Sequence, residues 1–205
     1  MKSNFSSRAI NLKYSFLESI KDSKKTCFFL IILALIGILT GVFTAINYCN
    51  GATLANFSNF SLNKFLLGEL ATLDLFFHRF LSYTTVVIII SITSLSVYLT
   101  PINYFLIAYR GYLLSLNVSI MVILYGVGGI LTGILVVLPC QLISLIVISF
   151  YACFICKRAY NKKCYGTNSS KLFPKLILTL LVLTFINLAE TLLLAVFSSK
   201  VIFVI

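Results

Sequence analysis

Five long apolar stretches dominate this chain and decide what it can fold into. Charge is nearly absent from them, because only Arg110 and Glu190 lie well inside a stretch. A hydrocarbon core about 30 Å thick needs about 20 helical residues to cross it, and the stretches meet or approach that length. We therefore predict an all-α, polytopic membrane bundle of about five transmembrane helices, at residues 27–46, 83–100, 102–124, 127–156 and 176–197.

The composition of the chain excludes a soluble domain. Of its 205 residues, 60% are hydrophobic and 10% are charged, and the mean hydropathy is +1.06. A water-soluble domain of this size needs more polar surface. The longest segment between the predicted spans, 47–82, is too short and too apolar to form an enzyme core of its own. We expect a single membrane domain over 1–205 that is not an enzyme.

Basic residues produce the net charge of +11 and gather in two blocks. One block precedes the first span, within residues 1–26, and the other fills 157–175, between the fourth and fifth spans. The positive-inside rule places both blocks in the cytoplasm. They orient the chain and can also attract anionic membrane lipid, and they do not indicate nucleic acid. We therefore expect a multi-pass membrane protein with a cytoplasmic N-terminus and an extracytoplasmic C-terminus.

The N-terminal tail, residues 1–26, carries a helical pattern. Ile10, Phe16, Leu17 and Ile20 share one helical face, and charged residues lie elsewhere. This pattern predicts an amphipathic helix on the inner leaflet. The apolar run that follows is about 20 residues long and ends in a poor cleavage sequence, so we interpret it as a retained span and not as a signal peptide.

Residues 47–82 are predicted to lie outside the cell. Apolar residues recur there every three to four positions, as on one face of a helix. We expect an interfacial helix along the outer surface, which either packs over the bundle or presents a docking surface to an extracytoplasmic partner. The candidate partner surface consists of Leu62, Phe65, Leu66, Leu73, Phe76, Phe77, His78 and Phe80.

Metal and cofactor chemistry has little basis in this sequence. His78 is the only histidine, so it supports neither a metal site nor a histidine-based catalytic pair. Cys153 and Cys156 have the spacing of a CxxC redox or metal motif, but they lie on an apolar stretch without a second pair of ligands. We interpret them as small buried apolar residues, and we expect no cofactor and no metal.

Small residues recur at four-residue spacing in three of the predicted spans. Such spacing lets helix backbones approach closely inside a membrane. We predict that these residues pack the helices of one bundle together, and self-association of whole chains is the alternative. They are Gly37 and Gly41 in the first span, Gly111, Ser115 and Ser119 in the third, and Gly129 and Gly133 in the fourth.

The polar residues inside the predicted spans lie at different depths. At about 1.5 Å per residue, Arg110 lies about 13 Å and Glu190 about 21 Å from the inner edge. Gln141, counted downward from residue 127 at the outer edge, lies about 9 Å above the inner edge. Arg110 and Gln141 therefore match best. Pro139 adds a reason, because it cannot donate a hydrogen bond to the carbonyl of Leu135 and leaves that carbonyl in need of a partner.

From these depths we predict a polar lock inside the membrane. Arg110 is expected to hydrogen-bond to the kinked region 138–141, and Asn117 and Asn187 are the expected neighbours of Glu190. Polar groups inside a membrane are costly, and they serve either as structural contacts or as an ion or proton pathway. We favour the structural role.

Several short motifs follow one another along the chain. They are Gly37 with Gly41, His78-Arg79-Phe80, Arg110-Gly111, Leu138-Pro139 followed closely by an amide, and Glu190. Their order and spacing resemble the stage II sporulation protein M family over nearly the whole chain. Two departures occur: Cys140-Gln141 stands where the family usually has Gln-Asn, and Thr191 follows Glu190 where the family usually has Ala.

This resemblance implies a non-enzymatic membrane scaffold. In spore-forming bacteria the family recruits and anchors cell-wall hydrolases at the septum during engulfment, so the implied partners are membrane-anchored peptidoglycan hydrolases. A competing interpretation is a transporter or permease subunit in which Arg110, Gln141 and Glu190 line a translocation path beside the kinked fourth helix. A third interpretation is an immunity-type membrane protein that blocks an incoming toxin.

Overall fold

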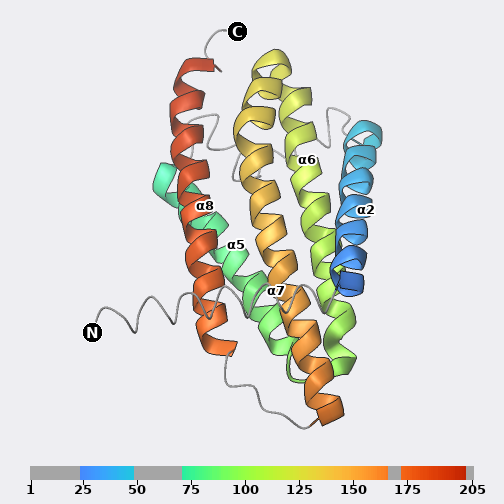
Figure 1. Cartoon of the computed structure of the whole chain (residues 1–205). Coiled ribbons are helices and arrows are strands. Elements are labelled where there is room, and N and C mark those ends of the chain that lie inside the picture. The colour runs from blue at the N-terminus through green and yellow to red at the C-terminus, as the bar shows by residue number, and fades with distance from the viewer. Residues whose placement is uncertain (1–23, 49–70, 166–171, 202–205) are drawn as a thin grey trace, which may run out of the picture.

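Five long helices make up most of the described chain, and they form an elongated bundle in which α5 is tilted across the others (Figure 1). The structure is a computed structural model, and it describes residues 24–48, 71–165 and 172–201. All five helices are long and apolar enough to cross a membrane, in agreement with the predicted all-α class. They are α2 (Lys24–Tyr48), α5 (Thr72–Thr93), α6 (Thr100–Thr132), α7 (Leu138–Tyr165) and α8 (Leu172–Val201).

The two ends of the bundle gather different segments of the chain. One end, called the Lys24 end, contains the start of α2, the connection between α5 and α6, the C-terminal end of α7 and the start of α8 (Figure 1). The other, called the Gly126 end, holds the end of α2, the reversal within α6 at Gly126, and the end of α8. The described residues of both basic blocks therefore lie at the Lys24 end, where α2 begins, α7 ends and α8 begins.

The second long helix begins earlier than the sequence predicted. α5 occupies Thr72–Thr93 in place of the predicted span 83–100. The prediction places Arg79 in the external segment 47–82, whereas in the structure Arg79 lies inside α5, buried and paired with Glu190. Residues 72–82 thus belong to a helix long enough to span a membrane, which corrects the predicted interfacial helix over this part.

Other predictions concern residues that the structure does not describe. Most of the N-terminal amphipathic tail lies outside the described residues, and so do Leu62, Phe65 and Leu66 of the candidate partner surface. The predicted basic loop 157–175 is shorter in the structure, because α7 and α8 both extend into it.

A proline marks the start of α6. The chain leaves α5, passes through a short 3-10 helix, Val97–Leu99, and enters α6 with Pro101 in the first turn. A proline costs little there, because the first N–H groups of a helix have no partner within the helix. Residues 83–124 therefore form parts of two separate helices.

A glycine within α6 reverses the chain before the π-helical turn and α7. Gly126 has a φ of 53°, a left-handed conformation that glycine adopts without steric strain. The residues after it fold back along α6, so that Gly129 lies against the carbonyl of Met121. A π-helical turn, Gly133–Val137, then leads into α7.

α2 and α6 pack along a row of small residues, called the glycine seam. Gly37 lies against the backbone carbonyl of Ala108, and Gly41 lies against that of Tyr112. A Cβ atom at either glycine would overlap the backbone of α6, so only glycine allows this approach. The seam consists of Ala34, Gly37 and Gly41 from α2, and Ala108, Gly111, Tyr112 and Ser115 from α6.

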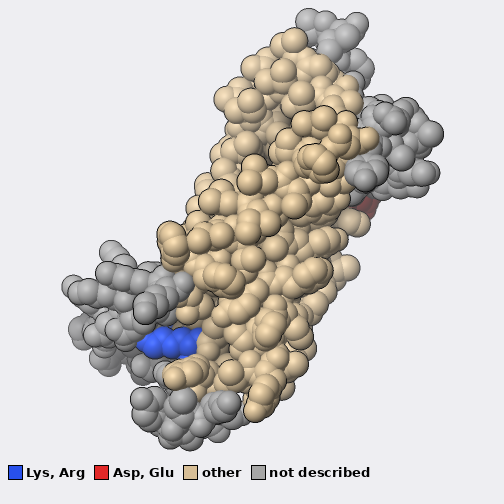
Figure 2. Space-filling view, turned by 90° about the vertical axis from the view of Figure 1, so that its right-hand side faces the viewer, with Lys and Arg blue, Asp and Glu red and all other residues tan. Residues whose placement is uncertain are grey.

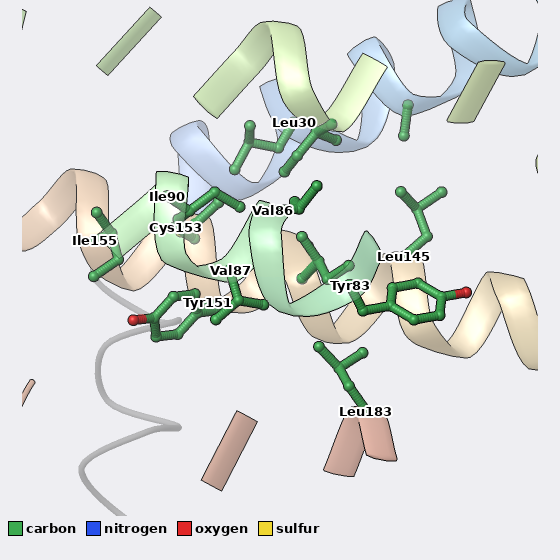
Figure 3. Close-up of a cluster of buried hydrophobic side chains, with 14 of the residues drawn as sticks. Leu30, Tyr83, Val86, Val87, Ile90, Leu145, Tyr151, Cys153, Ile155 and Leu183 are labelled. Atoms are coloured by element: carbon green, nitrogen blue, oxygen red, sulfur yellow. The ribbon is translucent and has the colours of Figure 1, made fainter. Parts of the chain in front are cut away.

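Buried apolar side chains form two main clusters among the described residues, one toward each end of the bundle. The Lys24-end cluster draws on all five long helices, and Figure 3 shows its side chains converging. The Gly126-end cluster joins α5, α6 and α8 to the π-helical turn. Members of the Lys24-end cluster include Tyr83, Val87, Ile90, Ile107, Leu145, Ile148, Tyr151 and Leu183, and the Gly126-end cluster consists of Leu75, Met121, Val136, Val137 and Leu194.

The outside of the bundle is also apolar. Leu39, Phe105 and Phe185 are 69%, 70% and 69% exposed, on three different helices. The face in Figure 2 carries no Lys, Arg, Asp or Glu across its middle, and charged side chains appear only toward its edges. A surface of this kind matches lipid better than water.

Candidate functional site

A layer of polar side chains lies between the two apolar clusters. On each contributing helix the polar residue falls between members of the two clusters; on α7, for example, Gln141 lies between Val137 and Leu145. The layer thus crosses the bundle at one level and divides its core. This polar layer consists of Arg79 on α5, Asn117 on α6, Gln141 on α7, and Asn187 and Glu190 on α8.

One carboxylate joins three helices within the polar layer. Glu190 is fully buried and forms an ion pair with Nη1 of Arg79. Gln141 donates a hydrogen bond from Nε2 to Oε1 of Glu190 over 3.3 Å. Because both charges are buried, removal of either one leaves the other without compensation, at a typical cost of about 3–5 kcal/mol. The carboxylate therefore fixes α5, α7 and α8 relative to one another.

A second polar contact joins α8 to α5. Asn187 lies one helical turn from Glu190, and its Nδ2 donates to the backbone carbonyl of Phe76 over 3.0 Å. The carbonyl of Phe76 lies in the same helix as Arg79, so the two contacts act on the same pair of helices. Together they fix the rotation of α8 against α5 and not only its distance.

Arg110 ties α6 to α5 by a separate set of contacts. Its Nη2 donates to the backbone carbonyl of Ser82 over 2.5 Å and to the Ser82 hydroxyl over 3.0 Å. Its guanidinium lies 4.8 Å from the centre of the Tyr83 ring, within the range of a cation–π contact. The Tyr83 hydroxyl in turn accepts a hydrogen bond from Ser144 of α7 over 3.2 Å.

These side chains surround a cavity of about 250 Å³ between α5, α6 and α7. This volume is enough for several water molecules or for one small charged group. Arg79 and Arg110 both line it, and no Asp or Glu does. Glu190 neutralises Arg79 from outside the cavity. Among the described residues, no acidic side chain is paired with Arg110. The lining consists of His78, Arg79, Ser82, Tyr83, Tyr109, Arg110, Leu113, Leu114, Asn117, Gln141, Ser144, Leu145 and Ile148.

Apolar packing closes this cavity along the bundle axis. Toward the Lys24 end, Val87, Ile90 and Ile107 of the Lys24-end cluster are each 0% exposed. Toward the Gly126 end, the Arg79–Glu190 ion pair and the Gly126-end cluster close the core. Exposed lining residues occur on the side of the bundle, where His78 of α5 and Tyr109 of α6 flank the cavity. The cavity therefore opens sideways, between two helices.

The structure brings most of the predicted polar residues to one place but pairs them differently. Arg110 and Gln141 line the same cavity, yet Arg110 donates to Ser82 and not to the region 138–141. Gln141 donates to Glu190 instead. Asn117 also lines the cavity, and its Oδ1 is buried without a hydrogen-bond partner among the described residues.

The backbone before Pro139 forms a π-helical turn and makes no hydrogen bond to Arg110. The turn before it is π-helical, and the N–H of Leu138 bonds to the carbonyl of Gly133, five residues earlier. This wider turn shifts the hydrogen-bond pattern before the proline is reached, as π turns in helices do. It gives a local reason why Arg110 is not drawn to this region.

The sequence reasoning missed Arg79, Ser82, Tyr83 and Ser144 as members of the site. A signal for Arg79 is present, because it lies four residues after Leu75 and four before Tyr83, all three on the buried face of α5. Arg79 also lies seven residues from Thr72, the end of its candidate span. Glu190 lies seven residues from the end of its own span, at Phe197. These equal distances from the span ends indicate that Arg79 and Glu190 lie at the same depth and can pair.

The structure also describes part of the candidate partner surface. Leu73, Phe77 and His78 are exposed on α5, whereas Phe76 and Phe80 are partly buried and stack at 6.1 Å between ring centres. Within the described residues, no group of His, Cys, Asp and Glu is arranged to hold a metal ion.

No disulfide joins Cys27, Cys140, Cys153 or Cys156 to another described residue. Cys153 and Cys156 are buried in and beside the Lys24-end cluster. Cys27 of α2 and Cys153 of α7 lie with their sulfur atoms 2.7 Å apart, and Cys156 accepts a hydrogen bond from Asn103 over 3.4 Å. The pair between Cys27 and Cys153 joins two helices that are distant in the sequence.

Comparisons of the chain with models of known protein families, with curated proteins and with solved structures found no match. The function is therefore argued from the geometry of the bundle and from the sequence resemblance.

Proposed function

We propose that the chain is a non-enzymatic membrane scaffold. It recruits or anchors membrane-bound peptidoglycan hydrolases during sporulation engulfment or related envelope remodelling. The observation that carries this proposal is the polar layer, whose charged residues tie helices together and lie between two apolar clusters. Such a core holds a fixed shape, which a scaffold requires and a carrier that alternates between two states does not.

The charge distribution supports an orientation for the scaffold. The described residues of both basic blocks lie at the Lys24 end, so the positive-inside rule places that end in the cytoplasm. The N-terminus is then cytoplasmic, and α8 ends on the outer side. The polar layer falls in the outer half of the bundle, nearer to the side on which peptidoglycan lies.

One face of α5 offers a surface for a partner. Leu73, Phe77 and Leu81 recur at four-residue spacing and are 70%, 62% and 66% exposed. They form an apolar stripe along a helix whose opposite face is fixed by Arg79. A transmembrane helix of a hydrolase or of its anchor can pack against such a stripe inside the lipid.

A second candidate function is transport of an anion. The observation in its favour is the cavity with the unbalanced charge of Arg110. Against it stand the fully buried apolar residues on both sides of the cavity, because an anion that moves along the bundle axis would have to pass them.

Site-specific photo-crosslinking tests the scaffold. A photoreactive amino acid at Leu73, Phe77 or Leu81 in the living cell should capture a protein with peptidoglycan-hydrolase activity, read out by mass spectrometry and by a gel that contains peptidoglycan. The same amino acid at Phe185 of α8, which is equally exposed, is the matched control. Capture of the same proteins from both helices, or of no hydrolase from α5, contradicts the proposal. Uptake of a radioactive anion by vesicles that contain the pure protein would favour transport instead.

A further inference from the structure

Arg110 carries a charge that the described protein does not balance. It is the only charged residue in the candidate span Val97–Ile123, and it lies at the midpoint of that span. Its described hydrogen bonds use Nη2 alone and go to neutral groups of Ser82. Its Nε is buried without a partner, although a guanidinium has five N–H donors. A charge this deep in a membrane is costly without a counter-charge.

The approach to Arg110 is from the lipid and not from water. The cavity is closed along the bundle axis by the two apolar clusters, and its exposed lining residues face sideways. Beside the cavity lining, α5 and α6 also carry exposed apolar side chains. Phe105 and Tyr109 of α6 stack at 6.3 Å between ring centres, and Leu81 of α5 is 66% exposed on the other helix. An occupant must therefore reach the guanidinium from within the membrane.

Depth and charge narrow the chemistry of that occupant. The phosphate of a lipid headgroup lies about 15 Å or more from the bilayer centre, half of a core about 30 Å thick, whereas Arg110 lies midway along its span. A carboxylate accepts two parallel hydrogen bonds from a guanidinium, and it can be carried to the bilayer centre on a helix. The helix that carries it can pack its apolar side chains against Phe105, Tyr109 and Leu81.

We infer that the Arg110 cavity is a receptor for an Asp or Glu side chain in the transmembrane helix of a partner protein. The carboxylate enters between α5 and α6 and pairs with Arg110, while the apolar helix covers the opening. This inference rests on the proposed scaffold function, because it names the chemistry by which the scaffold would hold its partner. Arg79 does not compete for the carboxylate, because Glu190 already neutralises it.

Designed transmembrane peptides test the inference on the full-length chain. The probe is a leucine-rich helix of about 20 residues with one central Glu, and the control carries Gln at the same position. Binding is measured by energy transfer between labelled protein and labelled peptide in phosphatidylcholine vesicles. The Glu peptide should bind about tenfold more tightly than the Gln peptide, as expected for one strong polar contact between helices in lipid. Equal binding of the two peptides overturns the inference.

Two further measurements decide what occupies the cavity. Arg110→Gln should remove the preference for the Glu peptide, and a Cys27–Cys153 cross-link in that variant reports that the bundle is still folded. Because the peptide comparison is made on the native chain, a variant that fails to fold does not affect it. Loss of the preference when phosphatidylglycerol is added to the vesicles, or when acetate or phosphate is added to the buffer, would identify a lipid or a soluble anion as the occupant and overturn the inference.

The peptide-binding comparison and the photo-crosslinking experiment test the receptor and the scaffold independently. If α5 captures a hydrolase but the Glu and Gln peptides bind equally, the scaffold function stands and the carboxylate receptor does not. If the Glu peptide is preferred but no hydrolase is captured, the receptor stands and the identity of the partner changes.

Discussion

The glycine seam and the polar layer hold the same bundle by different physics. In the seam, Gly37 and Gly41 let α2 approach α6 until backbone meets backbone, so the contact consists of van der Waals packing. In the polar layer, Glu190 joins three helices through an ion pair and a hydrogen bond. The seam tolerates no added volume, whereas the layer tolerates no missing partner. The four predictions below follow from this difference.

The largest effect is expected in the polar layer. Glu190→Leu leaves the guanidinium of Arg79 buried without its counter-charge, and we expect the free energy of unfolding to fall by about 3–5 kcal/mol. Denaturant titration of the purified protein in detergent micelles measures this change. The double variant Arg79→Met with Glu190→Leu removes both charges and should recover most of the loss. An equal loss in the single and double variants would show that the charges are not coupled.

The glycine seam should respond to volume instead. Gly37→Ala places a methyl group against the carbonyl of Ala108, so the helices must separate, at a cost of about 1–3 kcal/mol. Gly133→Ala is the matched control, because its Cβ would lie 3.4 Å from Val118, an ordinary contact. The control should be neutral or stabilising by up to about 1 kcal/mol. Similar unfolding curves for the two variants would argue against a tight seam.

A double-mutant cycle separates the observed pairing from the one predicted by depth. Gln141→Leu combined with Glu190→Gln should show a coupling of about 1 kcal/mol, because the two side chains share a hydrogen bond. Gln141→Leu combined with Arg110→Gln should be additive to within about 0.5 kcal/mol, since no hydrogen bond joins them. Unfolding free energies of the five variants give both couplings. A larger coupling to Arg110 would restore the pairing expected from the sequence.

The smallest effect is expected at the contact between α2 and α7. Cys27→Ala removes only a weak thiol contact with Cys153 and should change stability by less than about 1 kcal/mol. The same pair is a sensitive reporter of distance. Mild oxidation with copper phenanthroline should link Cys27 to Cys153, detected by mass spectrometry of the digested protein. It should leave Cys140, which is next to Gln141 in the sequence, unlinked. A link between Cys140 and Cys27 would place α2 elsewhere on the bundle.

The sequence was sufficient for the seam because its signal is local. Gly37 and Gly41 lie one helical turn apart, and the same holds for Gly111 and Ser115. Such spacing can be recognised within a single span, and the structure places these residues between α2 and α6. The number of long apolar helices and the boundary at Pro101 follow from equally local features, namely length, hydropathy and a missing backbone donor.

The pairing inside the polar layer could not be found in the same way. Arg79, Gln141 and Glu190 belong to three helices, so their contact depends on where each helix begins. A start of α5 at residue 83 excludes Arg79 from the membrane, and Glu190 then has no cation at its own depth. The error arose because the whole segment 47–82, and Arg79 with it, was placed outside the membrane. A buried charge with a buried partner gives the same local pattern.

The central claim is that the cavity beside the polar layer is closed along the bundle axis and opens only toward the lipid. Cysteine labelling tests it directly, with Tyr109→Cys at the side of the cavity in a variant whose six native cysteines are replaced by alanine. A lipid-soluble maleimide should react with this cysteine, and a charged, membrane-impermeant thiol reagent should not react from either side of the membrane. Reaction with the charged reagent from either side would reveal a water-filled path to the cavity and would contradict the account.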